Sequence, residues 1–226
     1  LAFHEYALIP QTAAFVIMVF ITAFGVLLSI AYDRKELAVL AIIGGFGTPF
    51  FVSTGSGNFS VLLTYILILD IGMLTLVYFK KWNVINYLAY GFTYLLFLGV
   101  YFTKFIDNQD ETRLPLFLFL TAFYLIFYLM TIIYNVKNSR KFKYPEIMML
   151  LTNSSLYFGL GLGLVQGYSE GLLSGLFAGL VALFNFGFVF ALYKRKDIDK
   201  NLLFLLIGLV LTFVSLIAPI QLDGNY

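Results

Sequence analysis

Residues 59–79 read FSVLLTYILILDIGMLTLVYF, and the next two residues are Lys80 and Lys81. An α-helix rises about 1.5 Å per residue, so roughly 20 apolar residues cross the hydrocarbon core of a bilayer. This run has that length and holds a single charged residue, Asp70. It therefore predicts a membrane-spanning helix that ends at a basic connection in water.

Similar apolar segments lie on both sides of this run. Hydrophobic residues make up 61% of the chain and charged residues 12%, which excludes an ordinary water-soluble domain of this length. We predict an all-α polytopic bundle that forms one membrane-embedded domain over residues 1–226. The eight expected spans are residues 12–32, 37–51, 59–79, 84–102, 114–136, 147–165, 171–193 and 201–220.

The basic residues alternate between the connections. Two of the 14 Lys and Arg residues, Lys104 and Arg113, lie between spans four and five, whereas all the others follow spans one, three, five and seven. Short loops rich in Lys and Arg stay on the cytoplasmic side of a bilayer. The alternation thus predicts eight spans with both ends of the chain outside. The residues on the predicted inner side are Arg34, Lys35, Lys80, Lys81, Lys137, Arg140, Lys141, Lys143, Lys194, Arg195, Lys196 and Lys200.

The second segment is short and carries residues that interrupt helices. A re-entrant hairpin is the alternative there, but it would move every later basic loop to the opposite side, so we favour a full span. The sixth segment is also rich in glycine, and broken helices at matching places in two halves indicate transporter binding sites. Glycine packing would explain the same pattern. The predicted helix break and candidate binding region consists of Gly44, Gly45, Gly47 and Pro49.

Small residues on the seventh segment predict close packing of helices. Gly171, Gly175 and Gly179 repeat every four residues, and Asn185 continues nearly the same face. In lipid, small residues allow backbones to approach, and polar side chains bond across helices. We expect Asn153 in the sixth segment to form such a bond.

Asp70 is the sharpest candidate for chemistry. It lies at the centre of its span, where an ionised carboxylate costs several kcal/mol, so it should face the bundle interior or a wet cavity. One interpretation is a neutral acid or a proton-linked site. The other is a protonated, structural Asp bonded to a neighbour such as Asn153 or to a backbone carbonyl. No Lys, Arg or His lies inside a predicted span to pair with it.

No catalytic motif is visible elsewhere. His4 is the single histidine and stands beside Glu5, which a solvated terminus explains; cysteine is absent. We therefore predict no catalytic residue, no metal site and no cofactor, and an enzyme is the less favoured class. Acidic residues that share the predicted outer side with His4 are Glu5, Asp107, Asp110, Glu111, Glu170 and Asp223.

Three further stretches carry a family resemblance. They are residues 37–49 (LAVLAIIGGFGTP) leading into residues 53–58 (STGSGN), residues 153–161 (NSSLYFGLG) and residues 218–224 (APIQLDG). Their order is similar to that of the bacterial predicted membrane proteins grouped as domain of unknown function 2339. The resemblance implies a long, multi-pass protein of the bacterial cytoplasmic (inner) membrane, of which this chain is a part. It supplies no established reaction, and it leads us to expect a neutral polar residue such as Asn at position 70.

These observations leave three function classes. The first is movement of a small solute, ion or lipid-like molecule, which a mid-depth cavity containing Asp70 would indicate. The second is a structural or assembly subunit, for which residues 171–179 would form an exposed groove. The third is a membrane enzyme for envelope precursors, with an outward pocket joining His4 to Asp223. The expected partners are the lipid bilayer and other membrane helices or subunits. The net charge of +2 gives no indication of nucleic acid.

Overall fold

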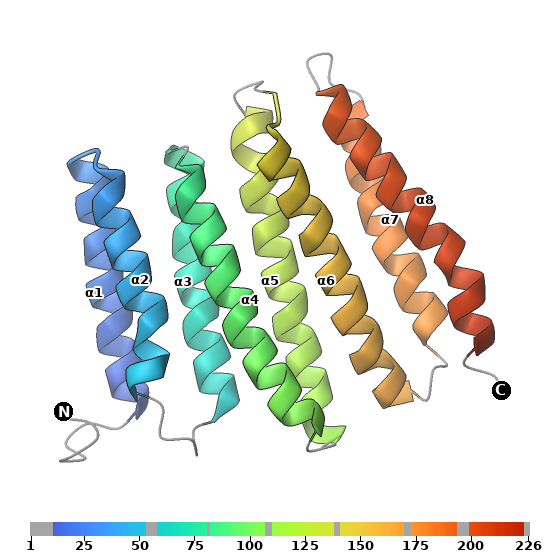
Figure 1. Cartoon of the computed structure of the whole chain (residues 1–226), viewed down its shortest axis with the longest axis horizontal. Helices are drawn as coiled ribbons and strands as arrows, with labels where there is room; N and C mark the ends of the chain where they lie inside the picture. Colours follow the sequence, from blue (N-terminus) through green and yellow to red (C-terminus); the bar gives the residue numbers. More distant parts are fainter. Residues whose placement is uncertain are drawn as a thin grey trace. The chain divides into compact units, whose positions relative to one another are not determined.

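The computed structural model describes residues 11–52, 58–80, 82–106, 110–137, 141–169, 173–193 and 199–223. Within these ranges every regular element is an α-helix (Figure 1), which confirms the predicted all-α class. The helices are α1 (Gln11–Ala31), α2 (Lys35–Val52), α3 (Phe59–Phe79), α4 (Asn83–Ile106), α5 (Asp110–Lys137), α6 (Tyr144–Ser169), α7 (Ser174–Tyr193) and α8 (Lys200–Asp223).

Seven of the eight described helices are long and apolar enough to cross a membrane. The exception is α2, which at 18 residues is the shortest. The bounds of α3 coincide with the predicted span. By contrast, α5 begins at Asp110 rather than at residue 114, and α6 runs from Tyr144 to Ser169 rather than over 147–165. Hydropathy marks the apolar part of a helix, and polar residues continue these helices past it.

The helix break predicted in the second segment is wrong, because α2 is continuous. Gly44, Gly45, Gly47 and Pro49 all lie inside one continuous helix. Proline has no N–H and leaves the carbonyl four residues earlier without its helical donor. Here that carbonyl belongs to Gly45, and it accepts a hydrogen bond of 2.6 Å from the hydroxyl of Tyr65 in α3. A neighbouring helix thus satisfies the freed backbone group, which is how membrane helices tolerate proline.

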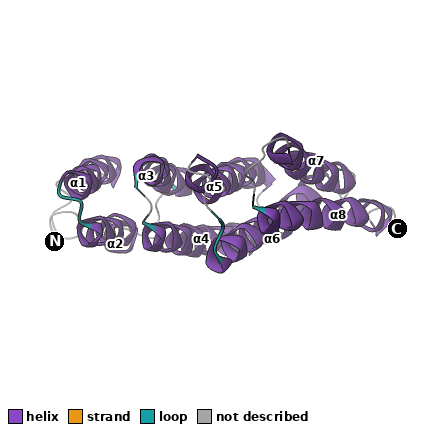
Figure 2. Ribbon diagram, turned by 90° about the horizontal axis from the view of Figure 1, so that it is seen from above, coloured by secondary structure: helices purple, strands orange, loops and turns teal. Residues whose placement is uncertain are grey.

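The helices group into two compact units. The first unit is Leu1–Ile106 with Leu125–Met130, and the second is Asp107–Tyr124 with Thr131–Tyr226. In the first unit α1 packs on α2 and α3, and α4 packs on the same two helices. Figure 2 shows α1 and α3 in one row and α2 and α4 in the other. In the second unit α7 packs on α8 and α6, and α6 also contacts α8.

In the first unit, the two Lys- and Arg-rich connections lie together. Asp33 has a φ of 52°, in the left-handed region that Asp tolerates better than most residues. The N–H groups of Asp33 and Arg34 bond to the carbonyls of Ile30 and Ser29, which closes the end of α1. Lys80, at the end of α3, then contacts Asp33 at 2.7 Å. The ion pair is exposed and contributes about 0–1 kcal/mol. It nevertheless shows that the α1–α2 and α3–α4 connections lie at the same end of the first unit.

In the second unit, the α5–α6 and α7–α8 connections also meet. The carboxylate of Asp199 accepts from the N–H of Asn201 at the start of α8 and from the N–H of Phe142, at 2.9 and 2.6 Å. Glu146 accepts from the N–H of Lys143 and from the side chain of Asn135, both at 2.8 Å. Within each unit, therefore, the basic connections lie at the same end, as the alternation of charge requires.

Candidate functional site

Asp70 is fully buried and bonded to the neighbouring helix. Its carboxyl group lies in the middle of α3, and the hydroxyl of Thr93 in α4 donates to its two oxygens at 2.9 and 3.1 Å. Both side chains are 0% exposed. The interior position agrees with the placement expected from sequence, but the partner is neither Asn153 nor a backbone carbonyl. Within the described ranges Asp70 forms no ion pair.

Aromatic rings of α4 pack against Phe127 of α5. The ring centroids of Tyr90 and Tyr94 are 4.8 Å apart, and Phe127, from the part of α5 that belongs to the first unit, meets Tyr90 edge-on at 5.3 Å. Phe127 is fully buried and Tyr94 nearly so. These rings form an apolar contact between α4 and this part of α5.

Asn86 provides a second polar group on α4. It precedes Thr93 by seven residues, which places the two on one face of the helix about 10 Å apart along its axis. Asn86 is 9% exposed, and its side-chain oxygen has no hydrogen-bond partner within the described part of the chain. Since buried polar atoms are normally paired, this oxygen is an unusual acceptor, which the described residues leave unused. Asn86 lies in the first turn of α4, close to the connection that contains Lys80.

A second polar cluster joins α1, α2 and α3. In addition to its bond with the Gly45 carbonyl, the hydroxyl of Tyr65 interacts with the side chains of Thr22 and Thr48. Both threonines are buried. A Cβ atom at position 45 would lie 2.8 Å from Oγ1 and 2.9 Å from Cγ2 of Thr22. Gly45 therefore serves close approach of α1 and α2.

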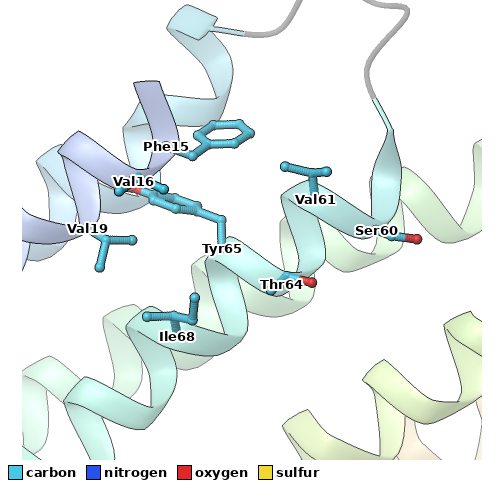
Figure 3. A pocket seen from close by; sticks show the side chains of 8 residues that line it. All are labelled: Phe15, Val16, Val19, Ser60, Val61, Thr64, Tyr65 and Ile68. Carbon is cyan, nitrogen blue, oxygen red and sulfur yellow. The ribbon is translucent and has the colours of Figure 1, made fainter. Parts of the chain in front are cut away.

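Beside this cluster, α1 and α3 enclose a groove of about 280 Å³ (Figure 3). The ring of Tyr65 forms part of its wall and stacks on Phe15, with centroids 4.8 Å apart. The lining is apolar except for a few hydroxyl groups. The residues that line the groove are Phe15, Val16, Val19, Ser60, Val61, Thr64, Tyr65 and Ile68.

The predicted packing residues lie in the second unit, apart from Gly171, which is outside the described residues. The N–H of Gly175 donates to the side chain of Gln221 in α8 at 3.0 Å, and Ile217 of the same helix lies 3.8 Å from a Cβ built on Gly179. The glycine face of α7 is thus covered by α8 of the same chain.

The two predicted asparagines converge on one tyrosine. Asn153 in α6 donates to the backbone carbonyl of Tyr124 in α5 at 3.1 Å. Asn185 in α7 donates to the Val181 carbonyl of its own helix at 2.9 Å and lies 3.5 Å from the Tyr124 hydroxyl. The Tyr124 ring stacks on Tyr157 with centroids 4.2 Å apart. These contacts join helices around an aromatic centre.

The acidic outer pocket considered for an enzyme cannot be placed. His4, Glu5, Asp107 and Glu170 lie outside the described residues. In the part of the chain that the structure does describe, no group of three or more His, Asp or Glu side chains could hold a metal ion.

Sequence reasoning did not identify Thr93, Asn86 or the carbonyl of Gly45. The spacing of Gly45 and Pro49 was a usable signal, because a proline four residues after any helical residue frees that residue's carbonyl. The pairing of Thr93 with Asp70 had no such signal, since it depends on the register between α3 and α4.

Apolar helices of membrane-crossing length, with buried polar groups bonded between them, define a multi-pass integral membrane protein. More particularly, the chain belongs to the family described as predicted membrane protein (DUF2339), whose model matches residues 1–226. The family expected from the sequence is thereby confirmed. No curated protein and no solved structure gives a significant match.

Proposed function

We propose that this protein moves a small solute or ion across the membrane in a step linked to protonation of Asp70. The observation that carries the proposal is a carboxyl group with 0% exposure in the middle of a membrane-spanning helix, bonded to a hydroxyl of the next helix. Ionisable residues inside membrane spans are rare and mark proton relays and ion pathways.

The chemistry follows from the absence of a charged partner among the described side chains. In its neutral form Asp70 fits an apolar interior and keeps its contact with Thr93. Once it loses its proton, the carboxylate requires water or a cation, because an uncompensated buried charge is strongly unfavourable. Loss of the proton therefore favours opening of the α3–α4 contact, and its return favours closure. This gives a protonation-driven alternation between two arrangements.

Asn86 supports an entry route to this site. Its unpaired oxygen lies on the same face of α4 as Thr93 and closer to the end of the helix. A water molecule bound to this oxygen would give a proton an intermediate position between the membrane surface and Asp70. The route starts at the end where Lys80 and Asp33 meet.

The alternation of basic connections supports an orientation. We propose that the protein lies in the bacterial cytoplasmic membrane, with the basic connections in the cytoplasm and residues 1 and 226 on the outer side. The assembly alternative loses its specific support, because α8 fills the glycine face of α7. No observation on the described residues favours an envelope enzyme.

Reconstitution of the full-length protein into vesicles containing a pH-sensitive dye tests the proposal. With a potassium diffusion potential imposed, wild-type vesicles should take up protons, and Asp70→Asn vesicles should match protein-free ones. Glu111→Gln is the matched control, since it removes an exposed carboxylate that is no part of the proposed route and should leave uptake unchanged. Equal uptake by wild type and Asp70→Asn would overturn the proposal.

A further inference from the structure

We propose that the basic end of the second unit binds the headgroup of an anionic phospholipid through Lys141, Lys143 and Lys200. We call these three residues the basic surface. They are separate from the Asp70–Thr93 pair, and the site goes beyond the proposed function.

Two connections that are far apart in sequence form the basic surface. The N–H of Phe142, in the α5–α6 connection, donates to the carboxylate of Asp199, in the α7–α8 connection, at 2.6 Å. Lys141 and Lys143 flank Phe142, and Lys200 directly follows Asp199. The hydrogen bond therefore holds three lysines at one place, at the ends of four apolar helices.

The carboxylates beside these lysines are bonded to other donors. Asp199 accepts from the backbone N–H groups of Phe142 and Asn201. Glu146 is buried and accepts from a backbone N–H and from an asparagine side chain. All three lysines of the basic surface are exposed, and within the described residues none of them forms an ion pair. Their positive charges are thus available to an anion.

Positive charge is in larger excess here than at the basic end of the first unit. Residues 137–146 and 194–200 carry eight basic and three acidic residues, whereas the two basic connections of the first unit carry four and two. In the first unit, moreover, Asp33 pairs with Lys80 at 2.7 Å. Charge complementarity therefore favours an anionic partner at the second unit.

Two exposed tyrosines place the basic surface at the level of lipid headgroups. Tyr144, the first residue of α6, is 73% exposed, and Tyr193, the last residue of α7, is 72% exposed. Tyrosine concentrates where membrane spans meet water, because its ring is apolar and its hydroxyl is polar. Lys143 directly precedes Tyr144. The anion within reach at this level is a phospholipid phosphate, and basic pockets between spans bind such headgroups.

The chemistry of lysine suits this ligand. Its ammonium group is a compact charge on a flexible stem, so lysines from two connections can converge on one phosphate. Exposed charges are screened over about 8 Å at physiological salt. We therefore expect the binding to weaken as the salt concentration rises.

Native mass spectrometry of the full-length protein, titrated in detergent with phosphatidylglycerol or with phosphatidylcholine of the same chain length, tests the proposal. The wild type should bind phosphatidylglycerol more tightly. Each of Lys141→Gln, Lys143→Gln and Lys200→Gln should lower that affinity by about fivefold, the effect of one basic residue near an anionic membrane. Replacement of the same three lysines by arginine keeps the charge and should keep the preference.

The combined variant Arg34→Gln, Lys35→Gln and Lys80→Gln is the matched control, because it removes three basic residues from the basic end of the first unit. It should bind phosphatidylglycerol like the wild type. Equal affinity of the wild type for both phospholipids, or an equal loss in the control and in the combined variant of the basic surface, would overturn the proposal. So would full displacement of the lipid by millimolar inorganic phosphate, or retention of RNA in place of phosphatidylglycerol.

Discussion

At the scale of single residues, the structure connects two features that look unrelated in sequence. Pro49 deprives the Gly45 carbonyl of its helical donor, and Tyr65 of α3 supplies another. An average hydrogen bond between membrane helices contributes about 0.6 kcal/mol. An orphaned buried acceptor costs about 1–3 kcal/mol. The larger cost, that of an orphaned acceptor, applies here, because α2 itself cannot replace the donor that Pro49 lacks.

Removal of the Tyr65 hydroxyl should therefore be costly only while Pro49 is present. We expect Tyr65→Phe to lower the free energy of unfolding by about 1–3 kcal/mol. In a Pro49→Ala background, position 49 regains its N–H, and the cost should fall to about 0.6 kcal/mol. Equilibrium unfolding in mixed micelles of the wild type, Tyr65→Phe, Pro49→Ala and the double variant measures both costs. An identical cost in both backgrounds would show that the Gly45 carbonyl is not the group that matters.

At the scale of helices, α1 and α2 approach each other through small residues. Gly45 faces Thr22, whereas a Cβ atom at the adjacent Gly44 would meet nothing within 4 Å. The two neighbouring glycines therefore form a natural comparison. One is required by packing, and the other is a glycine in an exposed position.

Gly45→Ala should destabilise the protein and Gly44→Ala should not. Alanine gains up to about 1 kcal/mol over glycine in a helix, but overpacking a tight contact costs about 1–3 kcal/mol. Both branches of the Thr22 side chain lie within 2.9 Å of the added methyl group, so a change of rotamer gives little relief. Thermal unfolding in detergent should rank the proteins as Gly44→Ala at or above wild type, and Gly45→Ala below it. The reverse order would contradict the assigned α1–α2 contact.

Hydropathy and charge predicted the helices better than the contacts between them. The bounds of α3 follow from an apolar run that ends at Lys80, and the burial of Asp70 follows from its central position. The continuity of α2 did not follow, because only the neighbouring Tyr65 compensates for Pro49. The choice of Thr93 as the partner of Asp70 could not be predicted either, since α4 carries several polar residues and periodicity does not set the register between helices.

At the scale of the whole molecule, alternation of charge predicts which connections share a side of the membrane. Asp33 with Lys80, and Asp199 with Phe142, bring the basic connections together within each unit. The sequence of 226 residues contains no cysteine, so single cysteines can report on sidedness.

We expect Glu111→Cys to react with a membrane-impermeant maleimide in intact cells, because the connection before α5 lies on the predicted outer side. Lys141→Cys and Lys200→Cys should react only after the membrane is opened. All three positions are exposed. The full-length background must lack other cysteines. Labelling of Lys141→Cys in intact cells would show that the orientation is the opposite of the one proposed.

The proposed mechanism requires that Asp70 gain and lose a proton while the protein stays folded. Infrared spectroscopy of the full-length protein in lipid, titrated with pH, measures this most directly. We expect a protonated-carboxyl band that is absent in Asp70→Asn, that shifts in Thr93→Val because its hydrogen bond is lost, and that disappears reversibly as the pH is raised. A spectrum without such a band, or with a band that persists until the protein unfolds, would contradict it.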